Sequence, residues 1–248
     1  MTPTPDAAGR APLVVGVIDS GVHADHPHIG AVATGAAFDP DGGAGPDCID
    51  RLGHGTAVAA AIQDLAPDVR ICPLKVFDRR LDAPVETLVA AIDWAAERAL
   101  PLVNLSLGTR HRSHAGALAD AAGRTHAAGT IIVAAGSDAG IDWLPGSLGV
   151  AGVIRVELDW SCPRGEHTAD GTATAAVFRT CGYPRPIPGV DPGRNLKGLS
   201  FAVANLSGIA ARVMVETGVR GYAALAEELH RRARPRGHPE SELDDRLM

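Results

Sequence analysis

Short apolar runs rich in β-branched residues alternate along the chain with longer stretches in which apolar residues recur every three or four positions. The short runs are typical of buried strands, and the longer spacing is typical of amphipathic helices. Strands are predicted at residues 13–18, 69–76, 102–107 and 130–135. Helices are predicted between them at residues 54–64, 84–99 and 116–128. This alternation predicts an α/β fold in which helices cover both faces of a mainly parallel sheet.

The second half of the chain has a less regular pattern. Strands are predicted at 152–157 and 173–179 among turns rich in Pro and Gly. Two further helices are predicted at 200–215 and 222–233. We therefore expect one large α/β domain over residues 13–233. An N-terminal segment, 1–12, precedes it, and a charged tail, 234–248, follows it.

The overall charge narrows the choice of partners. The 248 residues include 23 Lys and Arg against 29 Asp and Glu, which gives a net charge of -6. This balance argues against a nucleic acid or an anionic membrane as partner, because both favour a basic surface. The chain starts without the basic and apolar regions of a secretory signal, and no uninterrupted apolar run approaches the ~20 residues that span a bilayer. We expect a cytoplasmic protein with reduced cysteines and a peptide or protein partner, and its oligomeric state stays open.

Three residues have the chemistry of nucleophilic hydrolysis, which needs a hydroxyl, a base within hydrogen-bond reach and a group that fixes the tautomer of the base. Asp19 follows the first predicted strand, at the end where open α/β sheets place their sites. His54 begins a helix between Gly53 and Gly55, which let the backbone turn tightly. Ser200 begins a later helix, so its own N–H is available to a developing oxyanion. Each residue alone is more often an ordinary turn or helix-cap residue, and their joint occurrence in the order Asp, His, Ser carries the prediction.

Six ordered motifs resemble the subtilisin-like serine proteases, called subtilases. They are the Asp motif Val-Ile-Asp-Ser-Gly-Val at 17–22, the His motif at 54–59, the Ser motif at 198–202, and the segments at 73–76, 91–95 and 103–108. The order Asp, His, Ser is the order found in subtilisin. The resemblance covers residues 13–233 and implies a three-layer α/β/α fold with Asp19, His54 and Ser200 as the catalytic triad. Because the motifs begin almost at once, we expect a compact member of the family without a propeptide.

The resemblance also implies a substrate-binding surface. The positions that match the family's binding segments are Ser106, Leu107, Gly108, Leu81, Ala134, Ala135 and Gly136. Residues 106–108 and the segment around Leu81 should form two edges that hold the substrate as an added antiparallel strand. Residues 134–136 should wall the pocket for the side chain just before the scissile bond. Beyond this wall, Asp138 and Asp142 either favour a basic side chain there or are ordinary solvated loop carboxylates.

Two positions depart from the family pattern near the reacting atoms. Ser137 stands where the family usually has the Asn that donates to the oxyanion. Removing such a donor raises the barrier by about 2.7–4 kcal/mol, so we expect reduced activity unless the Ser137 hydroxyl or another donor takes its place. In the Ser motif, Ala204 and Asn205 replace the usual Pro-His pair, which lets the helix that begins at Ser200 relax.

The calcium sites typical of secreted subtilases have no match in this chain. His28 stands where the family has a ligand aspartate, and the ligand loop is shortened to residues 63–68. His23, His26 and His28 could suggest a transition metal, but no carboxylate or thiolate spacing supports one. We therefore expect neither a metal ion nor another cofactor.

These observations favour a serine endopeptidase that cleaves a peptide bond through an acyl-Ser200 intermediate, suited to maturing a specific peptide precursor. Two alternatives stay open. One is transfer of the acyl group to an amine, as in a peptide ligase or macrocyclase, which a relaxed helix at Ala204 would favour. The other is a catalytically weak peptide-binding scaffold, which Ser137 would favour.

Overall fold

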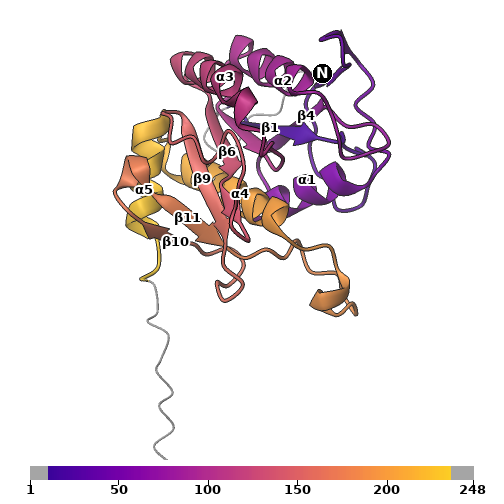
Figure 1. Ribbon diagram of the computed structural model, residues 1–248. Coiled ribbons are helices and arrows are strands. Elements are labelled where there is room, and N and C mark those ends of the chain that lie inside the picture. The colour runs from indigo at the N-terminus through magenta and orange to yellow at the C-terminus, as the bar shows by residue number, and fades with distance from the viewer. Residues whose placement is uncertain (1–10, 236–248) are drawn as a thin grey trace, which may run out of the picture.

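The computed structural model describes residues 11–235, which build one large sheet and one hairpin (Figure 1). The sheet has nine strands in the order β10-β11-β9-β6-β5-β1-β4-β2-β3. Along the chain these are β1 (Val14–Asp19), β2 (Ala36–Phe38), β3 (Ala44–Gly45), β4 (Arg70–Lys75), β5 (Leu102–Leu105), β6 (Ile131–Ala135), β9 (Val153–Leu158), β10 (Thr168–Asp170) and β11 (Val177–Thr180). The hairpin pairs β7 (Ser137–Asp138) with β8 (Ile141–Asp142). Residues 1–10 and 236–248, most of the two predicted terminal segments, lie outside the described residues.

The centre of the sheet is parallel. β4, β1, β5, β6, β9 and β11 pair side by side in one direction, and β2 joins β4 in the same sense. Only β3 and β10, at the two edges of this sheet, pair antiparallel. Parallel strands have both faces covered, so their side chains are apolar along the whole strand, and every residue of β5 and β6 is buried. The predicted mainly parallel sheet is confirmed.

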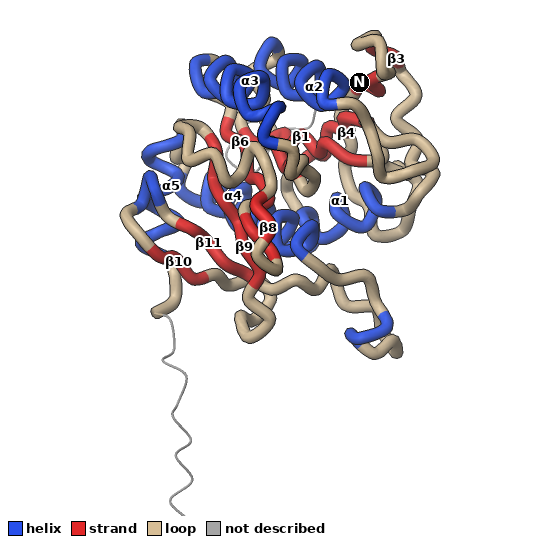
Figure 2. Tube along the Cα trace, viewed as in Figure 1, coloured by secondary structure: helices blue, strands red, loops and turns tan. Residues whose placement is uncertain are grey.

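Helices cover both faces of the sheet (Figure 2). α2 (Val85–Glu97) and α3 (Ala115–Ala127) pack on one face, and α1 (His54–Leu65), α4 (Leu199–Thr217) and α5 (Tyr222–Arg232) pack on the other. Successive residues of a strand point to opposite faces. In β1, Val15 and Val17 therefore join the core under α1 and α4, whereas Ile18 joins the core under α2 and α3. The fold is the three-layer α/β/α arrangement that the sequence predicts.

The long helix α4 forms the centre of one layer. It is apolar and long enough to cross a bilayer by composition alone, but 72% of its most apolar window is buried inside the protein. Gly208 lies where α4 meets α1: a Cβ built on it would lie 2.9 Å from Leu65 Cβ and 3.0 Å from the carbonyl oxygen of Ile62. The two helices therefore approach to a distance that leaves no room for a side chain at this position.

The structure departs from the predicted elements where strands are short or lie at an edge. The predicted strand at 173–179 starts too early, because Ala173–Ala175 form the short 3-10 helix η2 and β11 begins at Val177. The Tyr222 hydroxyl donates to the Thr174 carbonyl oxygen at 2.6 Å, so contact with α5 accompanies the helical turn. Five strands are too short for an alternation of apolar and polar residues to be recognised in the sequence: β2, β3, β7, β8 and β10. Two further 3-10 turns are η1 (Arg112–His114) and η3 (Pro192–Arg194).

The contact at Gly208 leads to a first prediction. Gly208→Ala should lower the free energy of unfolding by about 1–3 kcal/mol, because the added methyl group overpacks the α1–α4 interface. Gly123→Ala on α3 is the matched control, since a Cβ there meets nothing within 4 Å. The control should gain about 0.5–1 kcal/mol from helix propensity. Urea unfolding of both variants measures this, and equal midpoints would contradict the close approach of α1 and α4.

Candidate active site

Three elements bring the predicted triad to the carboxyl end of the sheet. Asp19 is the last residue of β1, His54 is the first residue of α1, and Ser200 lies in the first turn of α4. The ring of His54 lies 5.7 Å from the ring of Phe201, centroid to centroid. The imidazole is therefore next to the residue that follows Ser200.

Asp19 holds the imidazole of His54 in one orientation. Its two carboxylate oxygens lie 2.8 and 3.0 Å from His54 Nδ1, and the carboxylate is fully buried. The N–H of Ser20 donates to Asp19 Oδ1 at 2.8 Å and fixes the carboxylate in turn. With the Nδ1 proton donated to Asp19, Nε2 is the unprotonated nitrogen that a general base needs. Burial opposes protonation of His54, but the hydrogen bond and charge of Asp19 outweigh it and raise the pKa of His54 above its ordinary value.

The nucleophile is tied to the segment that follows β5. Ser200 Oγ donates to the carbonyl oxygen of Ser106 at 3.1 Å, and Ser106 Oγ donates to the carbonyl oxygen of Ser200 at 3.2 Å. Catalytic hydrogen bonds often form fully only when substrate is bound. Among the described residues the Ser200 hydroxyl bonds Ser106 and not His54, so the nucleophile–base hydrogen bond is left to form in the substrate complex.

The main chain at the start of α4 offers a donor for an oxyanion. Gly198 caps the helix without a side-chain hydrogen bond, and the first N–H groups of a helix lack acceptors within the helix. Among the described residues, the N–H of Ser200 has no recorded acceptor. It is therefore available to a negative charge that develops beside Ser200 Oγ, as the sequence predicts.

A buried chain of hydrogen bonds supports the Ser106–Ser200 pair. Ser207 Oγ donates to Asn104 Oδ1 at 3.0 Å, and Asn104 Nδ2 donates to Ser106 Oγ at 2.7 Å. Ser207 follows Ser200 by two helical turns and lies on the same side of α4. The predicted site does not include Asn104 or Ser207. The seven-residue spacing is a signal for Ser207, whereas the role of Asn104 depends on side-chain contacts that no spacing reveals.

Asp50, also outside the predicted site, organises the start of α1. Its Oδ1 accepts the N–H groups of Leu52 and Gly53 at 2.9 and 2.8 Å, and its Oδ2 accepts the N–H and hydroxyl of Thr56 at 2.8 and 2.6 Å. Ser20 Oγ donates to Asp50 Oδ1 at 2.9 Å, which links the cap to the strand that carries the catalytic carboxylate. Burial alone would raise the pKa of Asp50, but these hydrogen bonds outweigh it and lower that pKa. An Asp shortly before a predicted helix typically binds the N–H groups at the helix start, so the position of Asp50 in the sequence could have predicted this role.

The hydroxyl of Ser137, predicted to donate to the oxyanion, is engaged elsewhere. It donates to Asp142 and accepts a hydrogen bond from Arg155 at 2.8 Å. The hydrogen bond from Ser137 and the nearby charge of Arg112 hold the pKa of Asp142 below its usual range. A hydroxyl has one hydrogen to donate, so Ser137 would have to release Asp142 before it could serve an oxyanion. In this arrangement it does not serve one, because a carboxylate five residues further along competes for its proton.

Both predicted substrate edges line one groove of about 400 Å³. Leu107 and Gly108 come from one edge, and Leu81, which is exposed, comes from the other. The groove therefore joins the two segments that are expected to hold an extended peptide.

The predicted pocket wall ends strand β6 beside β5. Leu105 is in register with Ala134, so the wall continues directly from the neighbouring strand. Ala134 and Ala135 are buried in the core, and only their main chain and Gly136 can face a substrate. Ser106 is also buried, and both its hydroxyl and its carbonyl oxygen are hydrogen-bonded to Ser200.

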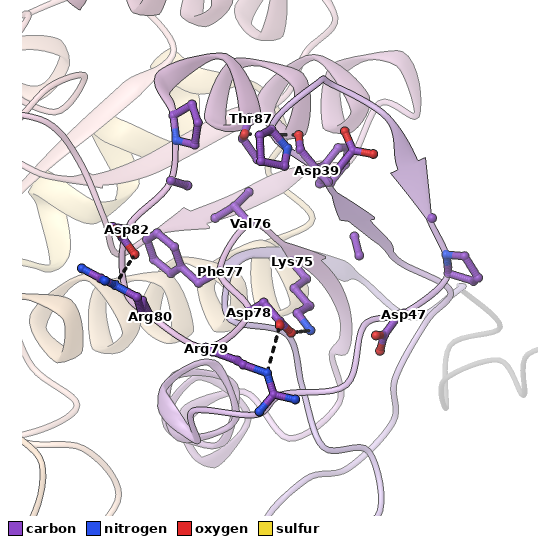
Figure 3. A pocket seen from close by; sticks show the side chains of 17 residues that line it. Asp39, Asp47, Lys75, Val76, Phe77, Asp78, Arg79, Arg80, Asp82 and Thr87 are labelled. Atoms are coloured by element: carbon purple, nitrogen blue, oxygen red, sulfur yellow. Dashed lines mark hydrogen bonds and ion pairs between the residues drawn. The ribbon is translucent and has the colours of Figure 1, made fainter.

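A cavity of about 560 Å³ lies behind the segment that carries the exposed substrate edge (Figure 3). Phe77 and Asp82 line both this cavity and the groove, so the segment between them separates the two. Lys75 of β4 and Arg79 both contact Asp78 at this cavity. Asp78 and Arg79 are exposed, so these ion pairs contribute little to stability.

The three histidines of the sequence cluster line a separate cavity of about 350 Å³ beside the start of α1. They are His23, His26 and His28. Within residues 11–235, no group of three or more His, Cys, Asp or Glu side chains could hold a metal ion. The four cysteines are all free.

A fixed Asp–His pair beside a serine at a helix N-terminus, on a three-layer α/β/α fold, defines this molecule as a serine hydrolase. The model of the subtilase family matches residues 11–153, more than half of the chain. The chain belongs to the subtilase family, a family of serine peptidases, which confirms the resemblance seen in the motifs.

Individual relatives agree with this membership. The chain is 27% identical to subtilisin DY of Bacillus licheniformis over 228 residues, which cover 82% of this chain and 77% of the relative. Other relatives at 27–29% identity are longer, and the chain spans 53–56% of their length. Among solved structures, an S41 psychrophilic protease matches with a TM-score of 0.71 at 20% identity, covering 90% of this chain and 83% of that one. A lanthipeptide protease matches with a TM-score of 0.64 at 19% identity, covering 87% of this chain and 78% of that one.

The raised pKa of His54 leads to a second prediction. His54 acts as a base only when it is neutral, so kcat/KM should fall as the pH drops through a pKa above the usual ~6.5 of histidine. Asp19→Asn removes the carboxylate that raises this pKa, so the imidazole should titrate at lower pH, and the rate should fall by about 10⁴-fold. NMR titration of the His54 ring in Ser200→Ala, with and without Asp19→Asn, measures the shift. An unchanged pKa would contradict the role given to Asp19.

A third prediction concerns the cap of α1. Asp50→Asn keeps the shape of the side chain but places an amide group against the Thr56 donors, which should cost about 1–3 kcal/mol of unfolding free energy at neutral pH. Because the pKa of Asp50 is lowered on folding, its contribution is present above the unfolded-state pKa and is lost as the pH falls through the folded-state pKa. The difference between variant and parent should therefore shrink in acid.

Thermal unfolding across the acid range measures this difference. Asp47→Asn is the control, because Asp47 is exposed and pairs with Arg51 at the surface. An equal loss in the two variants would show that Asp50 has no special role at the helix start.

Proposed function

We propose that the chain is an endopeptidase that cleaves a peptide bond through an acyl-Ser200 intermediate. The observation that carries this proposal is the fixed Asp19–His54 pair beside the start of α4. Membership of the subtilase family supports the same chemistry.

In the proposed reaction, His54 Nε2 takes the proton of Ser200 as Ser200 Oγ bonds to the substrate carbonyl carbon. The N–H of Ser200 donates to the oxyanion that develops, and Asp19 stabilises the imidazolium. His54 then gives its proton to the leaving nitrogen, and the C–N bond breaks to leave the ester. A water molecule, deprotonated by His54, releases the acid and restores Ser200.

The groove supports binding of an extended peptide. Its two edges, at Leu107–Gly108 and at Leu81, both line the 400 Å³ space. A peptide added as a strand gains its affinity from main-chain hydrogen bonds, and the side chains of alternate residues contribute specificity. Such a site suits a chain segment that is already unfolded.

We further propose that the substrate is a specific peptide precursor and that processing takes place in the cytoplasm. A groove lined by both predicted edges supports selective processing, because it would hold one extended segment of a peptide. A solved lanthipeptide protease has the same fold, which shows that this fold can carry such a task. The four free cysteines support a reducing compartment such as the cytoplasm.

A catalytically weak peptide-binding scaffold is the second candidate. The engagement of Ser137 by Asp142 and Arg155 favours it, because the side-chain oxyanion donor is then missing. Acyl transfer to an amine would use the same ester. α4 runs without a break from Leu199 through the buried Ala204.

A fluorophosphonate probe separates the enzyme from the scaffold. We expect it to add its mass to Ser200 in the parent protein, because the probe reacts only with a serine that its base activates. Ser200→Ala should not be labelled, and Ser161→Ala, which removes an exposed loop serine, should be labelled like the parent. Intact-mass and peptide mass spectrometry measure this. A folded parent that takes no label would support the scaffold instead.

A further inference from the structure

The backbone at Trp143 connects the predicted pocket wall with the predicted substrate edge. These two segments are expected to flank the substrate residue just before the scissile bond. The N–H of Trp143 donates to the carbonyl oxygen of Gly136, in the predicted wall, at 2.7 Å. The next residue, Leu144, exchanges main-chain hydrogen bonds of 2.9 and 3.2 Å with Thr109, which follows the predicted edge. The backbone at Trp143 therefore spans from wall to edge.

The side chain of Trp143 starts against Gly108 and lies on the Ser200 side of the sheet. A Cβ built on Gly108 would lie 3.4 Å from Trp143 Cβ. Adjacent residues of an extended segment point to opposite sides. Leu144 is buried in the core under α2 and α3, whereas Trp143 packs against the core under α1 and α4, which includes Phe201. The indole is only partly buried, so part of it is open to solvent on this side of the sheet.

The predicted wall at Gly136 is backed by the side chain of Arg155. A Cβ built on Gly136 would lie 2.5 Å from Arg155 Cγ and 2.8 Å from Arg155 Nε. Arg155 is held in turn by hydrogen bonds of 3.1 and 2.7 Å to Glu157 and of 2.8 Å to Ser137. Because Arg155 stays in place, the wall cannot move back to make room for a large substrate side chain.

We propose that Trp143 restricts the residue before the scissile bond to small side chains such as Gly, Ala or Ser. This inference rests on the proposed peptidase function and names its substrate class. A large side chain would have to displace the indole from its core contacts. Differences in the shape of an apolar site discriminate between substrates by about 10- to 200-fold.

Charge does not override this steric preference. The sequence allows Asp142 to favour a basic substrate side chain. In the structure, however, Asp142 forms an ion pair with Arg112 at 3.0 Å and accepts a hydrogen bond from Ser137. Asp138 is solvent-exposed, where the effect of a single charge is screened. The steric limit set by the indole is therefore the dominant determinant at this position.

Peptidyl diphenyl phosphonates test the proposal, because they modify the active-site serine in a single step that intact-mass spectrometry follows. Four probes differ only in the residue next to phosphorus, which is the analogue of Ala, Phe, Lys or Glu. The parent protein should react with the Ala probe at least about 10-fold faster than with the other three. Trp143→Ala should lose this preference and react with the Phe probe at least as fast as with the Ala probe.

Trp143→Phe and Trp94→Phe form a matched control pair in case the alanine variant does not fold. Trp94 lies in α2 and packs edge-on against Phe38, in the layer opposite α1 and α4. Trp143→Phe should shift the Ala-to-Phe ratio towards Phe, and Trp94→Phe should leave it unchanged. A parent that reacts as fast with the Phe or Lys probe as with the Ala probe would overturn the proposal while the peptidase function stands. A folded parent that reacts with no phosphonate and takes no fluorophosphonate label would overturn both.

Discussion

The close packing of α1 against α4 is the constraint on which the site depends. His54 is the first residue of α1 and Ser200 lies in the first turn of α4, so the distance between base and nucleophile follows from how closely these helices approach. Gly208 permits the approach, because α4 there touches Leu65 and Ile62 of α1 directly. Helices are stiff, and a side chain at this contact would displace their ends as well as their middles. A displacement of 1 Å between reacting groups can cost about 100-fold in rate, so this packing contact is also a catalytic constraint.

Two buried polar clusters turn this packing into a defined orientation of the reacting groups. Asp50 binds the free N–H groups at the start of α1 and reaches β1 through Ser20, so the helix that carries the base is fixed to the strand that carries its carboxylate. On the other side, Asn104 holds the Ser106 hydroxyl, which binds the main chain of the nucleophile. Buried polar groups are costly when unpaired, so each cluster resists rotation of any one member. Hydrogen bonds at the starts of both α1 and α4 therefore fix the orientation of the triad.

The sequence predicts the parts of this architecture that repeat along the chain. Buried parallel strands such as β1, β4, β5 and β6 are continuous apolar runs, and their ends agree with the structure to within two residues. The triad follows from ordered motifs, because each motif joins a chemical group to a turn that exposes it. What the sequence does not show is competition between neighbours in space. Ser137 occupies the position of an oxyanion donor, yet Asp142 and Arg155 take its hydrogen-bonding capacity, and their approach depends on the β7–β8 hairpin beside β9. Likewise, η2 forms where a strand is predicted because α5 packs on it.

The state of the oxyanion site sets the balance between rate and affinity. With Ser137 engaged, the N–H of Ser200 is the described donor that faces the developing charge. Loss of a second donor costs about 2.7–4 kcal/mol, or two to three orders of magnitude in kcat. Main-chain hydrogen bonds along the groove contribute about 1 kcal/mol each, so about three to four of them offset this loss in kcat/KM. The substrate makes these bonds equally in the ground state and the transition state, and they therefore lower KM without raising kcat. On the proposed function, the enzyme turns over slowly when saturated but competes well for a scarce peptide, which fits selective processing better than bulk digestion.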